Sequence, residues 1–116
     1  PIHYKRFSLP ENHMVNCDRP ESGLTGAFHL WNLEDFIKIG GLNPSLSSQF
    51  QDIDVCLRLL EDSKKIYYFG KDLYFYHDES AVHMNTKGHE KHSKEFKSDH
   101  LLFGKIWNDK IVRLIF

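Results

Sequence analysis

The chain has 116 residues, of which 41% are hydrophobic and 27% are charged, and its formal net charge is −1. This composition is typical of one compact soluble domain and argues against intrinsic disorder. The small net charge gives no electrostatic preference for nucleic acid, and no apolar run approaches the ~18 residues that a membrane span requires. The chain begins with Pro1, which suggests a fragment or a processed product. Cys17 and Cys56 are expected to be free thiols, because Cys56 lies within an apolar helical pattern.

The first third of the chain predicts short strands within irregular structure. Residues 1–23 contain Pro10, Pro20 and several other turn formers, with one short strand expected over Ile2–Phe7. The stretch "GLTGAFHLW", Gly23–Trp31, predicts a second short strand that has a glycine inside it. Such a glycine often lies where a ligand or another backbone comes close.

A short helix is predicted directly after this stretch. Asn32 is a typical N-cap residue, and Glu34 and Asp35 lie in the first turn, where the helix dipole favours acidic side chains. Gly40 suits the left-handed position that follows a helix C-terminus. The helix is therefore expected to end just before Gly40.

A second helix is predicted to begin near Gln51 or Asp52. Its apolar residues recur every three or four positions and predict one buried stripe: Ile53, Cys56, Leu57 and Leu60. Asp54 and Arg58 are four residues apart with the acid first, an order that stabilises a helix by roughly 0.2–0.5 kcal/mol. Cys56 lies in the middle of this predicted helix, so we do not expect it to be a nucleophile.

The remaining chain predicts two aromatic strands and a helical C-terminus. The strands are expected in "KKIYYFG" and "DLYFYH", and residues 79–92 are expected to form a mobile loop. One or two helices are predicted from Ser93, with Phe103 and Trp107 in the core. Ile111–Phe116 fits either a strand or a helix end. The outline is α/β, with a short mixed sheet and flanking helices.

Asp52 and Asp54 have two readings that their spacing leaves open. Both lie in the first turn of a predicted helix, where acidic side chains are stabilising without any further role. Alternatively, one of them is a general base that takes a proton from a substrate hydroxyl.

The order of motifs from Gly23 to Trp107 resembles the C-terminal half of the family-two glycosyltransferases, which have the GT-A fold. Five elements carry the resemblance: a Thr-Gly-Ala strand at 25–27, a Gly-Gly-Leu-Asn turn at 40–43, an acidic helix at 52–58, a Lys-Ile-Tyr-Tyr strand at 65–68 and the run Tyr-His-Asp-Glu-Ser at 76–80. The resemblance implies an inverting transferase that uses a nucleotide-sugar donor. Its acceptor would be a glycan, a polysaccharide or a lipid-linked sugar.

The resemblance also implies roles for individual residues. Asp52 matches the base that deprotonates the acceptor hydroxyl, and Asp54 matches the second acid of the same helix, which supports the base or orients the acceptor. His77 matches a histidine that helps bind the divalent cation, Mn²⁺ or Mg²⁺, on the donor diphosphate. Thr25 and Gly26 match the region where donor and acceptor meet.

Arg58 is the arginine of the same acidic helix, and the resemblance implies that it binds substrate.

Two departures from the family pattern stand out. Gln51 precedes Asp52, where the family commonly has a glutamate. The nucleotide-binding strands and the Asp-x-Asp metal motif of the N-terminal half do not appear upstream of Gly23. Residues 1–116 are therefore expected to be one domain, the acceptor-side part of a GT-A domain, inactive alone and short of a full set of cation ligands.

Other readings stay open beside the transferase. The missing donor half also fits a non-catalytic interaction domain on the same scaffold. The histidines of "HMNTKGHEKH", His83, His89 and His92, suggest an exposed polar loop, a zinc site lacking cysteine ligands, or a lid over a diphosphate. Uncovered apolar strands would favour a homo-oligomer. The family and the free thiols imply a cytoplasmic location, with peripheral association at the inner face of the membrane left open.

Overall fold

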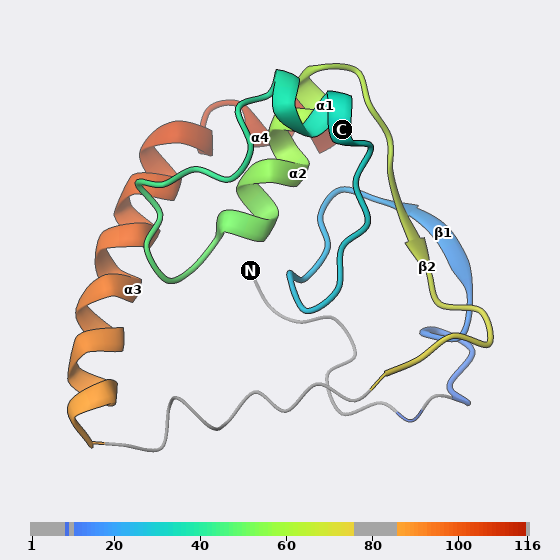
Figure 1. Ribbon diagram of the computed structural model, residues 1–116, viewed down its shortest axis with the longest axis horizontal. Helices are drawn as coiled ribbons and strands as arrows, with labels where there is room; N and C mark the ends of the chain where they lie inside the picture. The colour runs from blue at the N-terminus through green and yellow to red at the C-terminus, as the bar shows by residue number, and fades with distance from the viewer. Residues whose placement is uncertain (1–8, 10, 76–85, 116) are drawn as a thin grey trace.

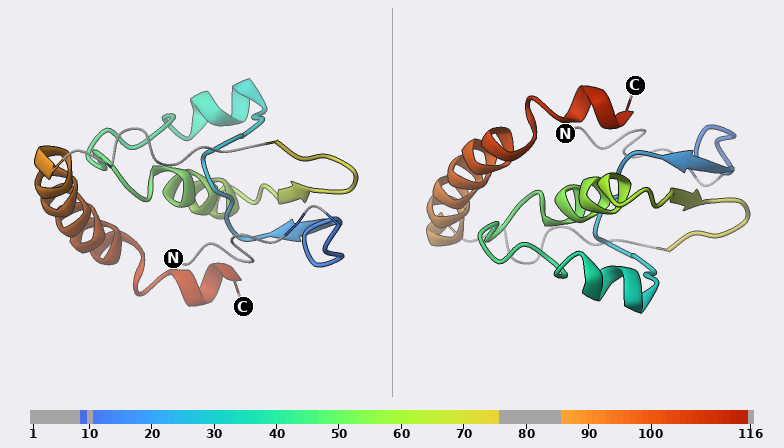
Figure 2. Two further views of the ribbon diagram at one scale, coloured as in Figure 1. Left: turned by 90° about the horizontal axis from the view of Figure 1, so that it is seen from below. Right: turned by 90° about the horizontal axis from the view of Figure 1, so that it is seen from above.

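The computed structural model describes residue 9, residues 11–75 and residues 86–115. In chain order these residues form β1 (Asp18–Glu21), α1 (Leu33–Lys38), α2 (Gln51–Glu61), β2 (Ile66–Phe69), α3 (Thr86–Trp107) and α4 (Ile111–Ile115) (Figure 1). The two further views show α2 between α3 and the sheet, with α1 and α4 on opposite sides of it (Figure 2). The predicted α/β class is confirmed, whereas a GT-A fold stays a prediction.

The sheet of the described residues has two strands. β1 pairs with β2 in antiparallel register, with Asp18 opposite Phe69 and Glu21 opposite Ile66. β2 confirms the strand predicted in "KKIYYFG", but β1 was not predicted. The strand predicted over Gly23–Trp31 is wrong, because the segment turns at Gly26 and has no neighbouring strand in the described chain with which to pair. In "DLYFYH", residues 72–75 are not a strand, and residues 76–77 lie outside the described residues, as does Ile2–Phe7.

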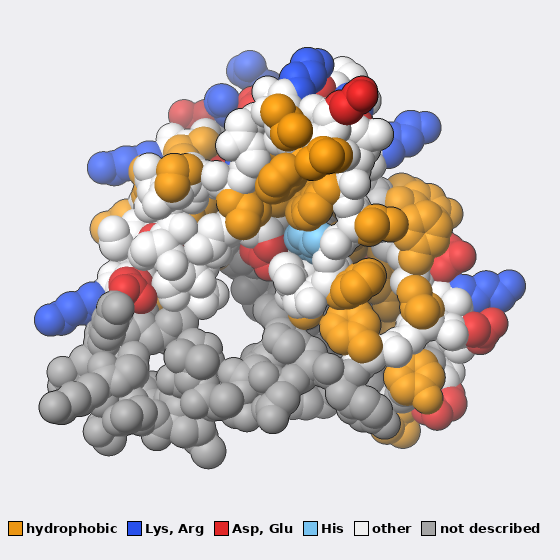
Figure 3. Space-filling view, in the orientation of Figure 1, with side chains coloured by type: hydrophobic (Ala, Val, Ile, Leu, Met, Phe, Trp, Pro, Cys, Tyr) orange, Lys and Arg blue, Asp and Glu red, His pale blue; other side chains and the backbone are white. Residues whose placement is uncertain are grey.

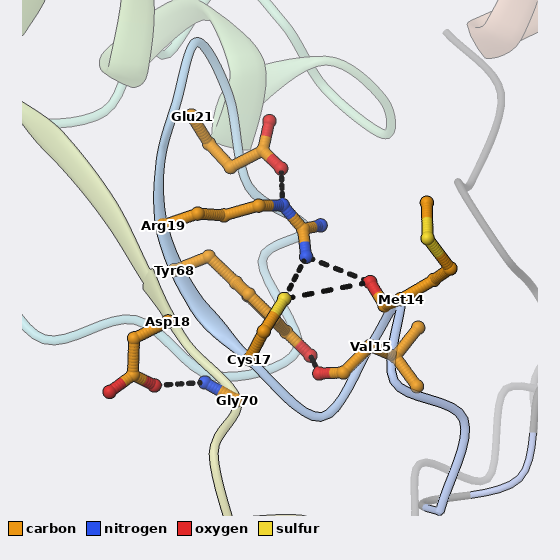
Figure 4. A network of polar contacts seen from close by, with 8 residues as sticks. All are labelled: Met14, Val15, Cys17, Asp18, Arg19, Glu21, Tyr68 and Gly70. Atoms are coloured by element: carbon orange, nitrogen blue, oxygen red, sulfur yellow. Dashed lines mark hydrogen bonds and ion pairs between the residues drawn. The ribbon is translucent and has the colours of Figure 1, made fainter.

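A polar network explains why the sequence "DRPE" forms β1 (Figure 4). The Arg19 guanidinium lies over the Tyr68 ring, 4.6 Å from its centroid, and Nη1 donates to the Met14 carbonyl and to the Cys17 sulfur, both at 2.9 Å. The Tyr68 hydroxyl donates to the Val15 carbonyl at 2.8 Å. Side-chain contacts from β2 therefore hold this polar segment in place, which hydrophobic periodicity could not reveal.

Helix α1 begins and ends as the sequence predicts. The Asn32 side-chain oxygen accepts the Asp35 N–H at 3.0 Å, which confirms the N-cap. Gly40 has φ +85°, and its N–H donates to the Ile37 carbonyl at 2.9 Å, while Gly41 donates to the Phe36 carbonyl at 2.9 Å. These two bonds form a Schellman motif, in which the left-handed position favours glycine.

Helix α2 lies at the centre of the core. It begins at Gln51 as predicted, and Cys56 and Leu57 are buried as expected. Ile53 and Leu60 are only half-buried, whereas Val55 and Leu59, outside the predicted stripe, are fully buried. The buried surface is wider than one stripe because α2 contacts β2 as well as α4.

The C-terminal third is more helical than expected. Of the loop predicted over residues 79–92, the part from Thr86 onward is helical. Residues 79–85 lie outside the described residues, so the loop predicted there and its mobility stay predictions. Trp107 is buried as predicted, and the half-buried Phe103 stacks on Phe50 with ring centroids 5.0 Å apart. α4 shows that Ile111–Ile115 is helical. Among the described helices, none has the length and apolar character needed to cross a membrane.

A buried carboxylate joins α2 to α3. Asp54 is 1% exposed, and its Oδ1 accepts the Trp107 indole N–H at 2.9 Å. Its Oδ2 accepts the Arg58 Nε–H at 2.8 Å, which confirms the predicted pair, and Arg58 Nη1 donates to the Ile39 carbonyl at 2.8 Å. A buried carboxylate is tolerated only when it is paired and hydrogen-bonded, and Asp54 meets both conditions.

Replacing Trp107 by phenylalanine tests this junction. Trp107→Phe removes the indole donor and leaves Asp54 Oδ1 buried without a partner, which should lower the free energy of unfolding by about 1–3 kcal/mol beyond the lost packing. Urea unfolding followed by far-UV circular dichroism measures it. Trp31→Phe is the matched control. Half-buried Trp31 stacks on Phe36, and within the described residues it makes no hydrogen bond to Asp54. An equal loss in the free energy of unfolding for the two variants would contradict the stabilising role of the bond between Trp107 and Asp54.

Candidate functional site

A groove of about 1150 Å³ opens between the segment 23–32, the first turns of α2, and the chain from Lys64 to Phe75. Asp52, Ile53 and Cys56 of α2 line it on one side. Aromatic side chains contribute much of the remaining lining: Phe28, Trp31, Tyr67, Tyr68, Phe69, Tyr74 and Phe75. Apolar side chains gather on the face between α1 and the sheet (Figure 3). The groove is thus aromatic, with a carboxylate beside it.

Asp52 holds the turn at Gly26 against helix α2. The half-buried carboxylate accepts the Gly26 N–H on Oδ2 at 2.8 Å and the Ile53 N–H of its own helix on Oδ1 at 2.8 Å. Each carboxylate oxygen has two acceptor positions, so both oxygens can still accept a further hydrogen bond. Thr25 and Asp52, which the resemblance implies in one region with Gly26, both line this groove, and Gly26 is bonded to Asp52 beside it.

The glycines in "GLTG" allow the segment to pass close to α2. A Cβ at Gly26 would lie 3.2 Å from Asp52 Cβ, and one at Gly23 would lie 3.0 Å from Ile53 Cδ1. The expectation that a glycine here permits a close approach is confirmed, and the neighbour is the chain's own helix. Because no side chain intervenes, the Gly26 N–H reaches the carboxylate directly.

Asp54 and Arg58 lie away from the groove. Neither residue lines it, and the buried Asp54 carboxylate accepts from Trp107 on one oxygen and from Arg58 on the other. Arg58 directs Nε to Asp54 and Nη1 to Ile39, and its buried Nη2 has no partner in the part of the chain that the structure describes. Both residues take part in the junction between α2 and α3. The acceptor and substrate contacts that the resemblance implies for them stay predictions.

Asp99 of α3 positions the loop that leads into α2. Its carboxylate is 1% exposed and accepts the backbone N–H groups of Ser47 (3.1 Å), Ser48 (2.7 Å) and Gln49 (2.8 Å). Burial by itself would raise the pKa of Asp99, but these donors outweigh burial and hold the pKa below its ordinary value. This anchor fixes the loop three residues before Asp52.

The predicted histidine ligands cannot be placed at the groove. His77 and His83 lie outside the described residues; His89 and His92 lie in α3, but their side chains are outside the described part as well. Within that part, no group of three or more His, Cys, Asp or Glu side chains is arranged to hold a metal ion. The described residues therefore supply no ligand set for Mn²⁺ or Mg²⁺, and the cation stays a prediction.

Sequence reasoning missed most of the groove lining. His29 lies 3.2 Å from the Leu24 carbonyl through Nε2 and meets Trp31 edge-on at 4.6 Å between ring centroids. The aromatic runs near residues 67 and 74 predict strands by their β propensity, and their density is the one signal in the sequence for an aromatic surface. Cys56 lies at the inner end of the site, where burial raises the pKa of its thiol, so the group stays protonated at neutral pH.

Comparison with known proteins gave no match to a family model, to a curated protein or to a solved structure. Any functional assignment therefore depends on the residues of this chain and on their geometry.

Gly26→Ala tests the contact between the turn and α2. The added Cβ must displace Asp52 by a few tenths of an ångström, which should lower the free energy of unfolding by about 1 kcal/mol. Gly104→Ala is the control, because a Cβ there meets only the Asn108 side chain at 3.4 Å within a helix that alanine favours. Chemical denaturation measures both variants, and a Gly26→Ala protein as stable as the parent would contradict the close packing.

Asp99→Asn tests the anchor through its pH dependence. A carboxyl whose folded pKa is lowered stabilises the fold above its unfolded pKa, about 3.9, and that contribution is lost as the pH falls through the folded value. We expect the variant to be less stable by about 1–3 kcal/mol at pH 7, with the difference shrinking below about pH 4. Urea unfolding at pH 7 and pH 3 measures this. Exposed Asp109→Asn is the control, and a pH-independent difference for Asp99→Asn would contradict the account.

Proposed function

We propose that this chain is the acceptor side of an inverting glycosyltransferase that uses a nucleotide-sugar donor. The observation that supports the proposal is the contact between Asp52 and Gly26, which joins two of the five motifs that resemble family-two glycosyltransferases. These residues are 26 positions apart in sequence, yet they meet at one groove. The donor-binding half would come from sequence other than residues 1–116.

Asp52 would act as the general base. Its carboxylate would take the proton of an acceptor hydroxyl while the acceptor oxygen forms a bond to the anomeric carbon of the donor sugar. The bond from that carbon to the diphosphate breaks, the electron pair leaves with the nucleoside diphosphate, and the configuration inverts. The N–H bonds from Gly26 and Ile53 would hold the carboxylate in position for this transfer.

The other residues would support this step. Thr25 lines the groove beside the base, and the aromatic lining offers flat apolar surfaces for the C–H faces of sugar rings. A divalent cation would neutralise the charge on the leaving diphosphate. It would be held by residues outside the described part, His77 among them. A cytoplasmic location, with or without contact at the inner face of the membrane, belongs to the same proposal.

Asp52→Asn tests the proposal. In the polypeptide that supplies both halves, the amide can still accept the Gly26 N–H but cannot take a proton, so turnover should fall at least about 100-fold. Donor affinity should stay unchanged. Transfer of a labelled sugar to acceptor measures turnover, and calorimetric titration measures donor binding.

Asp35→Asn is the matched control for this experiment. Asp35 lines the same groove, but its carboxylate pairs with Lys64 at 2.7 Å, so transfer should continue at close to the parent rate. Turnover that survives Asp52→Asn would assign the base to another residue.

A second candidate function, a non-catalytic interaction domain, has one observation in its favour. Large apolar side chains around the groove are exposed, among them Leu30 at 92% and Phe28 at 66%. Exposed apolar surface of this kind commonly marks a binding interface.

A further inference from the structure

The groove is bordered by a large exposed apolar surface. Six lining side chains, each more than half exposed, make up what we call the aromatic face: Phe28, Leu30, Phe69, Leu73, Tyr74 and Phe75. At ~150–250 Å² for each fully exposed aromatic side chain, the four aromatic residues leave about 500 Å² uncovered, and the two leucines add to this area. The largest apolar patch of a typical monomer is about 300–600 Å², whereas a stable complex buries about 800 Å² on each partner.

Helix α1 offers a convex apolar ridge at the margin of the same groove. Leu33 and Ile37 lie one turn apart and are 68% and 66% exposed, and none of the six residues of α1 is buried. Asn32 and Asp35, at the start of α1, line the groove itself. A ridge and a groove that each lack a cover are therefore adjacent in one chain.

The charges around the groove favour a second copy of this chain as the partner. Three basic side chains line it, Arg19, Lys64 and Lys65, and three acidic ones, Glu21, Asp35 and Asp52. This balance gives no attraction for a strongly charged partner such as nucleic acid or an anionic membrane. It also imposes no like-charge penalty when the face meets an identical face.

We propose that two copies pair about a two-fold axis, with the α1 ridge of each lying in the groove of the other. The contact is isologous, because both copies use the same surface and each ridge lies in the groove of the other copy. It follows the helix-in-groove mode of recognition. Two concave grooves placed face to face would enclose an unfilled space, whereas a ridge fills the groove. Pairing goes beyond the proposed transfer activity and covers the surface on which Asp52 lies.

Sedimentation velocity of the full chain over a concentration series tests the pairing. The parent should shift from monomer to dimer as concentration rises. Leu30→Glu in the groove and Leu33→Glu on the ridge should each raise the dissociation constant at least about tenfold, because each buries a charge at the contact. Leu101→Glu is the matched control: Leu101 is also 66% exposed but lies on α3, away from the groove, and its variant should pair like the parent.

Mixing the two weakened variants separates this geometry from general stickiness. The Leu30→Glu chain keeps its ridge and the Leu33→Glu chain keeps its groove, so the mixture should form heterodimers through one intact contact. All three substituted positions are largely exposed, and circular dichroism checks that each variant folds. A parent that stays monomeric, a continuous range of larger aggregates, loss of pairing in Leu101→Glu, or no recovery on mixing would each overturn the proposal.

Discussion

Two carboxylates on helix α2 join the parts of this molecule, and they do so on different sides of the helix. Residues two apart in an α-helix point about 200° away from each other. Asp54 consequently turns inward to the Trp107 indole and the Arg58 guanidinium, whereas Asp52 turns to the backbone of Gly26 at the groove. One side of α2 thus anchors the end of α3, and the other holds the turn beside the groove.

The different surroundings of the two acids separate their chemistry. Asp54 is buried, and both of its oxygens are bonded to side chains of the core, so it serves as a structural junction. Asp52 is half-buried, lines an open groove and, among the described residues, accepts hydrogen bonds from backbone N–H groups. Of these two acids, Asp52 is the one that combines a fixed position with a place at the groove. A partner that covers the exposed aromatic face would also cover Asp52. The proposed transfer and the proposed pairing would therefore compete for one surface.

Local sequence signals predicted the first two helices well, the start of α3 less well and the sheet poorly. The Asn32 cap, the Gly40 terminus and the start of α2 follow from rules that involve only neighbouring residues, and the structure confirms them. The strand expected at Gly23–Trp31 needs a partner strand that the described chain lacks, and β1 depends on contacts from Tyr68 that lie far away in sequence. Local sequence signals also predicted one part of the candidate site and missed another. Spacing marked Asp52 and Asp54 but could not tell which one is buried, because that depends on where Trp107 packs.

The central claim is that the Asp52 carboxylate accepts the Gly26 N–H beside the groove. Nuclear magnetic resonance of the ¹⁵N-labelled chain tests it through the Gly26 amide proton. We expect this resonance to lie downfield and to move upfield in an Asp52→Ala chain that remains folded, because alanine offers no acceptor to the Gly26 N–H. A Gly26 resonance that is unchanged by Asp52→Ala would contradict the contact and the site built on it.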